Sequence, residues 1–198
     1  MHVAQINIGT MVAPTDDPRV AEFMEALDAI NAIADEAPGF VWRLQTEAGN
    51  ATDIQIFPNP LELLNMSVWE TVDDLKAYVY RTEHVEFFRR RAEWFEAEAK
   101  RVALWHVAPG TIPDLAEAVR RVEFLERHGP TPYAFGFNQT PAPLTFDVGR
   151  DGVIVAVYDG QVVGRAVAGP EPTIEVSDDA VPLLADALLD QRELAADR

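Results

Sequence analysis

Hydrophobic and polar positions in the first half of the chain follow two periods, which predicts strands separated by helices. Residues 3–8 alternate with period two, so Gln5 and Asn7 fall on a polar face and apolar side chains on the other. The same reasoning predicts strands at 40–45, 63–70 and 102–107. In the third of the four strands, alternation places Asn65, Ser67 and Trp69 together on one face.

Helical spacing of apolar residues fills the intervals between these strands. One helix follows Asp17 and Pro18, which supply an N-cap and a first-turn proline, and ends at Gly39. A second stretch runs from a cap at Thr71 to about residue 101, with a bend near Thr82. A third helix occupies about 113–128. The segment 46–60 is expected to be mostly loop.

The order β-α-β-β-α-β predicts an α+β fold, the split βαβ plan of a ferredoxin-like sandwich. In that plan the helices lie on one face of an antiparallel sheet. The second face would carry apolar side chains that are unsuited to water, namely Ile6, Ile8, Met66 and Val68. We therefore expect a homodimer that buries this sheet face.

The composition changes at residues 139–144, which are interpreted as a linker between a main domain at 1–138 and an extension at 145–198. Within the extension, a strand meander is predicted at 145–148, 152–158 and 161–168, with a hairpin turn at Asp159 and Gly160. A helix is expected near the end of the chain. Because about 54 residues make a small core, we expect the extension to dock on the main domain.

Composition excludes several classes of function. The 198 residues include no cysteine, which rules out disulfides and thiolate metal sites and fits a cytoplasmic location. The formal net charge of −17 disfavours nucleic acid and anionic membranes as partners. The first residues lack the pattern of a signal peptide, and no stretch approaches the roughly 20 apolar residues of a membrane span.

Several short sequence motifs, in their order along the chain, resemble those of a known bacterial family. They are the Pro38–Gln45 segment, Asn65-x-Ser67-x-Trp69-Glu70, Tyr80–His84 with Arg89–Phe95, and Gly129–Pro132. Over residues 2–138 the chain resembles domain-of-unknown-function family 3291 (DUF3291). That family in turn resembles the dimeric α+β barrel superfamily, which includes antibiotic-biosynthesis monooxygenases and haem-degrading monooxygenases.

The resemblance implies roles for particular residues. In the cofactor-independent monooxygenases, an Asn and a Trp on one strand hold an aromatic substrate, and Asn65 and Trp69 match them. The haem-degrading branch uses an Asn on the first strand, matched by Asn7, and a helix His near position 79. This chain has Tyr78, Val79 and Tyr80 there, with His84 further on, which disfavours haem ligation.

The residues themselves predict a pocket on the polar sheet face that takes a small apolar or aromatic ligand. The Asn65 carboxamide could donate a hydrogen bond to an enolate or peroxide oxygen. Ser67 and Asn7 would contribute further polar contacts. An alternative is that these buried polar groups only satisfy one another.

Other candidates surround this strand. His84 is the expected acid or base, with Tyr80 at i−4 assisting it, although His84 could instead cap a bend. Arg43 or Arg81 could hold a carboxylate of the substrate. Trp105 is a candidate ligand contact, but alternation sends Trp105 and His106 to opposite faces and does not say which faces the pocket.

The three arginines at 89–91 are interpreted as a salt-bridged helix face, with Glu86 and either Glu93 or Glu96 as partners. The four histidines lack metal-ligand spacing, so neither a metal site nor a cofactor is expected. The function expected is that of a small-molecule enzyme, a cofactor-independent monooxygenase or isomerase acting on an apolar or aromatic carbonyl compound. The alternatives are a non-catalytic ligand-binding or dimerisation protein and, with less support, haem binding.

Overall fold

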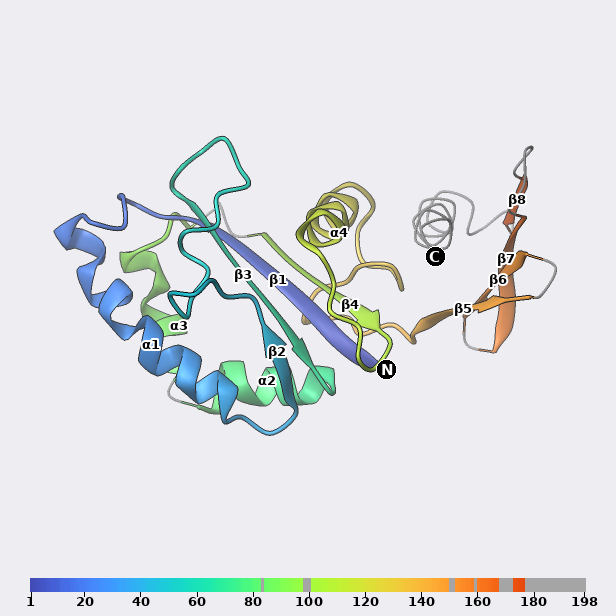
Figure 1. Ribbon diagram of the computed structural model, residues 1–198, viewed down its shortest axis with the longest axis horizontal. Coiled ribbons are helices and arrows are strands. Elements are labelled where there is room, and N and C mark those ends of the chain that lie inside the picture. Colours follow the sequence, from blue (N-terminus) through green and yellow to red (C-terminus); the bar gives the residue numbers. More distant parts are fainter. Residues whose placement is uncertain (83, 98–100, 150–151, 159, 168–172, 177–198) are drawn as a thin grey trace. The chain divides into compact units, whose positions relative to one another are not determined.

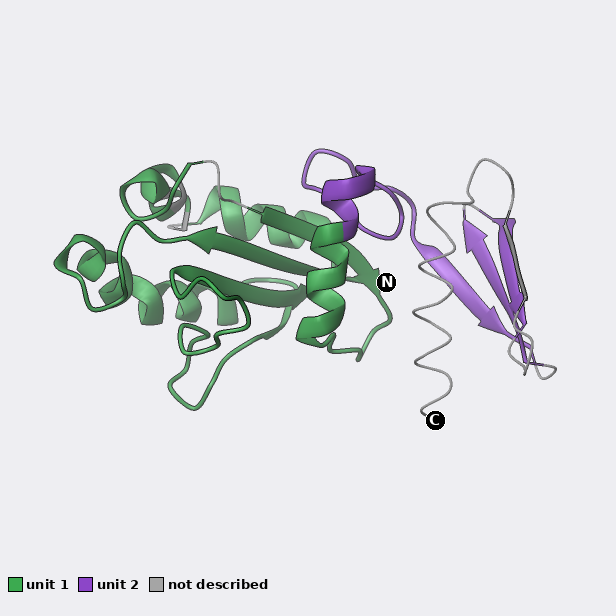
Figure 2. Cartoon of the chain, turned by 90° about the horizontal axis from the view of Figure 1, so that it is seen from above, with its two compact units in different colours: residues 1–123 green, residues 124–198 purple. Residues whose placement is uncertain are grey.

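The computed structural model describes residues 1–198 except 83, 98–100, 150–151, 159, 168–172 and 177–198 (Figure 1). The side chains of His84, Glu86, Phe88 and residues 173–176 are likewise outside the description. The chain divides into two compact units, residues 1–123 and 124–198 (Figure 2). The division falls inside a helix and not at the predicted linker 139–144. The predicted C-terminal helix lies outside the described residues.

Unit 1 contains the four predicted strands in one antiparallel sheet of order β2-β3-β1-β4. The strands are β1 (His2–Thr10), β2 (Phe40–Arg43), β3 (Glu62–Trp69) and β4 (Arg101–Val107). The helices are α1 (Ala21–Asp35), α2 (Val72–Arg81), α3 (His84–Arg90) and α4 (Leu115–His128), the last of which continues into unit 2. This is the predicted ferredoxin-like topology, so the α+β fold class is confirmed.

Local chemistry explains where the helices start. The Asp17 carboxylate accepts a hydrogen bond from the Arg19 backbone N–H and caps a short 3-10 turn, Pro18–Val20, that leads into α1. The Thr71 hydroxyl caps α2 by accepting from the Asp74 backbone N–H at 3.1 Å. Both caps agree with the sequence prediction.

The predicted helical stretch from Thr71 to residue 101 is broken, as the expected bend at Thr82 suggested, but it also ends earlier than predicted. The Thr82 hydroxyl donates to the Tyr78 carbonyl at 2.7 Å, and the Thr82 backbone is extended. After α3, a 3-10 turn at Arg91–Glu93 leads to Phe95, which forms a β-bridge with Met11. The chain is thus committed to extended structure before residue 101 because its backbone pairs with the end of β1.

The strand register defines two faces of the sheet. The first, called the Asn65 face, contains these residues: Val3, Gln5, Asn7, Gly9, Leu63, Asn65, Ser67, Trp69, Val102, Leu104 and His106. The second, called the Trp105 face, contains these: Ala4, Ile6, Ile8, Leu64, Met66, Val68, Arg101, Ala103 and Trp105. In Figure 1 the strands run between α1 and α2 on one side and α4 on the other.

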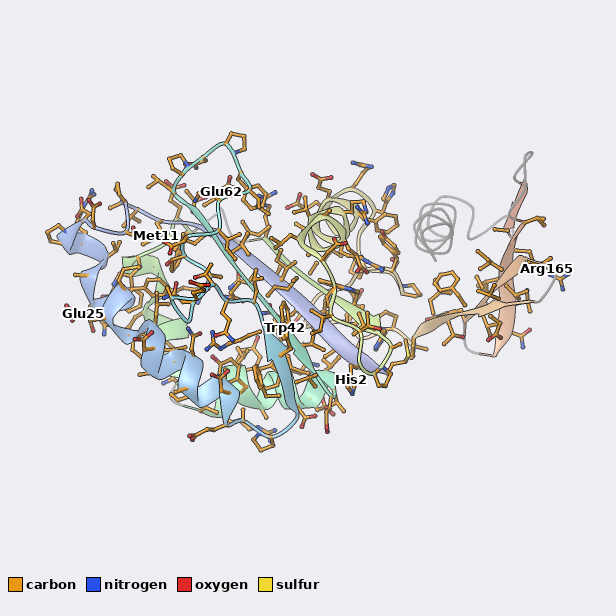
Figure 3. The ribbon with its side chains drawn as sticks, in the orientation of Figure 1. His2, Met11, Glu25, Trp42, Glu62 and Arg165 are labelled. Carbon is orange, nitrogen blue, oxygen red and sulfur yellow. The ribbon has the colours of Figure 1, made fainter. Side chains whose placement is uncertain are left out.

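The Trp105 face is buried within the single chain, contrary to the expectation that a second copy would cover it. Ile6, Ile8, Met66 and Val68 are each at most 1% exposed. The helix α4 lies on this side, where the Arg121 guanidinium is 5.9 Å from the centre of the Trp105 indole. At the far end Arg101 pairs with Glu62, labelled in Figure 3, at 2.9 Å. These four side chains are therefore not the exposed apolar surface from which a homodimer was predicted, and the homodimer itself stays a prediction.

The Asn65 face carries the other helices. At one end the Phe95 ring packs so closely on Gly9 that a β-carbon there would lie 2.9 Å from its Cδ1. Phe23 of α1 meets Phe95 edge to face, with ring centres 5.0 Å apart. At the other end Tyr78 of α2 stacks on Trp69. Helices therefore cover both ends of this face.

Unit 2 contains an antiparallel meander of order β5-β6-β7-β8. Its strands are β5 (Leu144–Val148), β6 (Val153–Tyr158), β7 (Gln161–Val167) and β8 (Thr173–Val176). The first three were predicted and the fourth was not. Its core joins the end of α4 to the sheet, through Phe124, Tyr133, Ala134, Leu144, Ile154, Ala156 and Ala166. This packing explains why unit 2 begins before the predicted linker.

Candidate functional site

The centre of the Asn65 face is open to solvent. Asn65 is exposed although its strand lies between two others, whereas Leu63 and Ser67 on either side of it are 8% exposed. Asn65 pairs with Asn7, and Asn7 pairs with Val102, so these three residues form a row across the sheet, called the Asn65 row. Asn7 and Val102 are half-buried. Solvent therefore reaches the sheet surface between the two helix-covered ends.

A hydrogen-bond network lies directly beside this row. The Gln5 amide nitrogen Nε2 donates to Asn65 Oδ1 at 2.8 Å and to Ser67 Oγ at 2.9 Å. The Trp69 indole Nε1 donates to the same Ser67 oxygen at 2.8 Å. Gln5 and Ser67 are 8% exposed and Trp69 is fully buried. The predicted grouping of Asn65, Ser67 and Trp69 with Gln5 is thus present, joined by side-chain hydrogen bonds.

The network leaves one group of Asn65 turned toward solvent. Its carbonyl oxygen is occupied by Gln5, and the described structure gives its Nδ2 no protein acceptor. Asn65 therefore presents an N–H donor at the one exposed position of β3. A donor fixed in place before a ligand arrives is the arrangement that stabilises negative charge on oxygen.

Trp69 lies in the core of the site and not at its surface. Its ring stacks on Tyr78 with centres 5.1 Å apart and 25° between planes. Phe40 meets it edge to face at 5.4 Å. With its N–H bonded to Ser67 and its ring enclosed, Trp69 positions the network. The sequence marked Trp69 as a residue in contact with substrate, and its burial corrects that expectation.

Tyr80 and Arg43 also differ from expectation. Tyr80 is 46% exposed, because two helical steps turn it about 200° from Tyr78, the tyrosine that faces the sheet. The Arg43 guanidinium donates to both Asp35 oxygens, at 2.8 and 3.1 Å, and to the Gly49 carbonyl at 2.7 Å. Arg43 therefore ties β2 to the end of α1 and to the following loop, and those bonds occupy the fork expected for a substrate carboxylate.

The strand register shows which of Trp105 and His106 lies on the Asn65 face. His106 pairs with Val3 and lies on the Asn65 face, whereas Trp105 pairs with Ala4 and is fully buried on the opposite face. The expectation that Trp105 contacts a ligand beside Asn65 is therefore wrong, because strand alternation turns its ring toward α4. His84 begins α3, but its side chain is outside the described residues, so its predicted role remains a prediction.

The charged and titratable side chains described near the site have structural roles. Burial raises the pKa of the Tyr78 phenol well above its usual range; the nearby Arg43 lowers it and Asp35 raises it by smaller amounts. Tyr78 is therefore a neutral ring and not a base. In the basic run, Arg90 pairs with Glu22 at 2.6 Å and Glu93 at 2.8 Å, as the salt-bridged interpretation expected for Glu93.

The described part of the chain has neither a candidate metal cluster nor a candidate membrane span. It contains no cluster of three or more His, Cys, Asp or Glu side chains placed to hold a metal ion. None of its helices combines the length and apolar character that a membrane crossing requires.

Sequence reasoning missed the partners that fix Trp69. Neither the stacking of Tyr78 on Trp69 nor the contact of Phe40 with the same ring was foreseen. Gln5 was placed on the correct face, yet its position at the centre of the network was not predicted. The signal available was register, because Gln5 and Ser67 occupy directly opposed positions.

The comparisons with known proteins bear on family and fold. Residues 2–148 match the model of the family described as domain of unknown function (DUF3291). The chain belongs to this family. The match covers all of unit 1 and extends through β5, which is ten residues beyond the predicted domain end at 138. No curated protein matches the sequence.

Solved structures with some similarity include a cofactor-independent oxygenase from Streptomyces nogalater, SnoaB, with 17% identity and a TM-score of 0.40. That match covers 57% of this chain and 98% of the other. A conserved protein from Methanosarcina mazei Go1 has 16% identity and a TM-score of 0.42, and the match covers 55% of this chain and 94% of the other. A proposed antibiotic biosynthesis monooxygenase from Nitrosomonas europaea has 19% identity, a TM-score of 0.39, and coverage of 56% and 94%.

Proposed function

We propose that the protein acts on a small apolar or aromatic carbonyl compound, whose oxygen is bound by the Asn65 amide. The single observation that carries the proposal is the exposed Asn65 Nδ2, held beside a buried network of Gln5, Ser67 and Trp69. The reaction class is oxygenation or isomerisation through an enolate. In both, removing a proton from a carbon adjacent to the carbonyl, or conjugated with it through a ring, moves negative charge onto its oxygen.

A fixed amide donor favours such a reaction for a physical reason. Because Gln5 holds the Asn65 carbonyl, the Nδ2 protons need little reorganisation when charge develops on the bound oxygen. Losing one donor of this kind typically costs about a hundredfold in rate. The half-buried Val102, beside Asn7 in the Asn65 row, offers an apolar contact to the rest of a ring compound.

Oxygenation of an anthrone illustrates the chemistry with balanced atoms. The ring CH2 loses two hydrogens, one oxygen atom of O2 becomes the new carbonyl, and the other leaves as water. The substrate supplies all four electrons, so no separate reductant is needed. In this scheme Asn65 binds the existing carbonyl oxygen, and His84 on α3 is the proposed proton acceptor.

The test is oxygen uptake by the purified protein with a panel of anthrones and hydroquinones. Asn65→Ala should reduce the rate about a hundredfold if the amide stabilises the enolate. The matched control is Asn138→Ala, at an exposed asparagine in unit 2, which should keep the wild-type rate. Equal rates for wild type and Asn65→Ala would refute the oxygenase.

Non-catalytic binding of the same class of compound is the second candidate. It is favoured by one observation: the side chains joined by the network, Gln5, Asn65, Ser67 and Trp69, do not titrate. Binding without oxygen consumption or isomerisation, lost in Asn65→Ala, would identify this function. The two candidates thus share a site and differ in turnover.

A further inference from the structure

Gln5 is the member of the network that decides which end of the Asn65 amide faces solvent. It lies on β1 directly opposite Ser67 and one step diagonally from Asn65. Its side chain is nearly buried, and Nε2 donates both of the side-chain hydrogen bonds described for it. Gln5 is therefore the link between the buried indole and the exposed amide.

Trp69 fixes the direction of one bond in the network, and the Gln5 amide fixes the others. An indole N–H can only donate, so Ser67 Oγ is an acceptor toward Trp69. The second lone pair of that oxygen accepts from Gln5 Nε2. With its nitrogen turned toward Ser67, Gln5 also offers an N–H to Asn65, and the Asn65 carbonyl turns inward to accept it. With Gln5 held in this orientation, a reversed Asn65 would set two donors against each other beside a buried amide.

We infer that Gln5 is a positioning and specificity-determining residue: it makes the open site a hydrogen-bond donor, selective for ligands that present an acceptor oxygen. The inference rests on the proposed function for the location of the ligand, at Asn65, but not for turnover. It predicts that replacing the Gln5 amide by a carboxylate reverses the site. A carboxylate accepts from Asn65 Nδ2 and from the Ser67 hydroxyl, so the Asn65 carbonyl turns outward.

The experiment compares two bicyclic probes of similar size by titration calorimetry. The carbonyl of 1-indanone only accepts hydrogen bonds, whereas indole only donates one through its N–H. Wild-type protein should bind 1-indanone more tightly than indole. Gln5→Glu should bind indole more tightly, with the affinity ratio changing by at least about tenfold, which equals 1.4 kcal/mol.

Gln5→Met is the second variant, because it keeps the length of the side chain and cannot fix the Asn65 amide. Its affinity ratio should move close to one. The Trp69 indole N–H resonance in NMR spectra reports whether each variant keeps the fold around Ser67. A reversal that occurs with this resonance retained cannot come from general loosening of the core.

Two results would overturn the inference. One is that Gln5→Glu still binds 1-indanone more tightly than indole. The other is that the wild-type protein binds the two probes equally or binds neither of them. Failure of the proposed function is distinguishable from both. If the probe preference reverses as expected while Asn65→Ala leaves oxygen uptake unchanged, the role of Gln5 stands and the oxygenase does not.

Discussion

The indole of Trp69 and the phenol ring of Tyr78 stack with their centres 5.1 Å apart and their planes 25° from parallel. This stack joins α2 to β3 at the end of the network that leads to Asn65. The tryptophan is thereby fixed by its ring on one side and by its N–H bond to Ser67 on the other. Trp69 therefore holds the hydrogen-bond network in place. Changes to the residues around Trp69 should affect stability as well as activity.

Removing the Tyr78 ring should destabilise unit 1. Tyr78→Ala leaves a cavity against the buried Trp69, and such truncations of large aromatic residues typically cost about 3–5 kcal/mol. Tyr80→Ala is the matched control two residues away on the same helix, and it should change stability by less than about 0.5 kcal/mol because Tyr80 is 46% exposed. Urea denaturation followed by tryptophan fluorescence measures both. Similar losses in the two variants would contradict the arrangement.

Tyr78 should also make the protein sensitive to alkaline pH. Burial raises the pKa of its phenol in the folded state above the unfolded value of about 10. The folded protein then retains this proton where the unfolded chain has released it. The associated stability is fully present below pH of about 10 and is lost as pH rises further.

Tyr78→Phe removes this titrating group while keeping the ring. The free energy of unfolding, measured at intervals from about pH 8 to pH 11, should fall less steeply for Tyr78→Phe than for wild type above pH of about 10. Identical slopes would show that the Tyr78 phenol does not titrate differently in the two states.

Ser67→Ala should be costly for so small a change. The hydroxyl oxygen accepts from two donors, Trp69 Nε1 and Gln5 Nε2, and the first of these is fully buried. Leaving a buried donor without an acceptor costs about 1–3 kcal/mol. Thr111→Ala, at an exposed threonine, provides the comparison and should be nearly neutral. Thermal and urea unfolding that do not separate the two variants would argue against the network.

Much of the fold could be predicted because strand alternation and helix caps are local. The shared face of Asn65, Ser67 and Trp69 follows from period two alone, and the caps at Asp17 and Thr71 follow from residue type and spacing. The four-strand topology then follows from the order of elements.

What could not be predicted depends on partners distant in sequence. The burial of Trp69 requires Tyr78 and Phe40 to reach it from other elements. The hydrogen bonds that occupy the Arg43 guanidinium require Asp35 at the end of α1. The Trp105 face was expected to need a second copy, because the sequence did not show that α4 packs on that side.

The central claim is that the Asn65 amide stabilises negative charge on a bound carbonyl oxygen. The most direct test mixes anthrone with the protein in the absence of oxygen and follows the absorbance of its enolate. Wild-type protein should shift bound anthrone toward the enolate. Asn65→Asp, which has the same size but replaces the donor by an acceptor oxygen, should not do so. Equal enolate absorbance with wild type and Asn65→Asp, both folded, would contradict the claim.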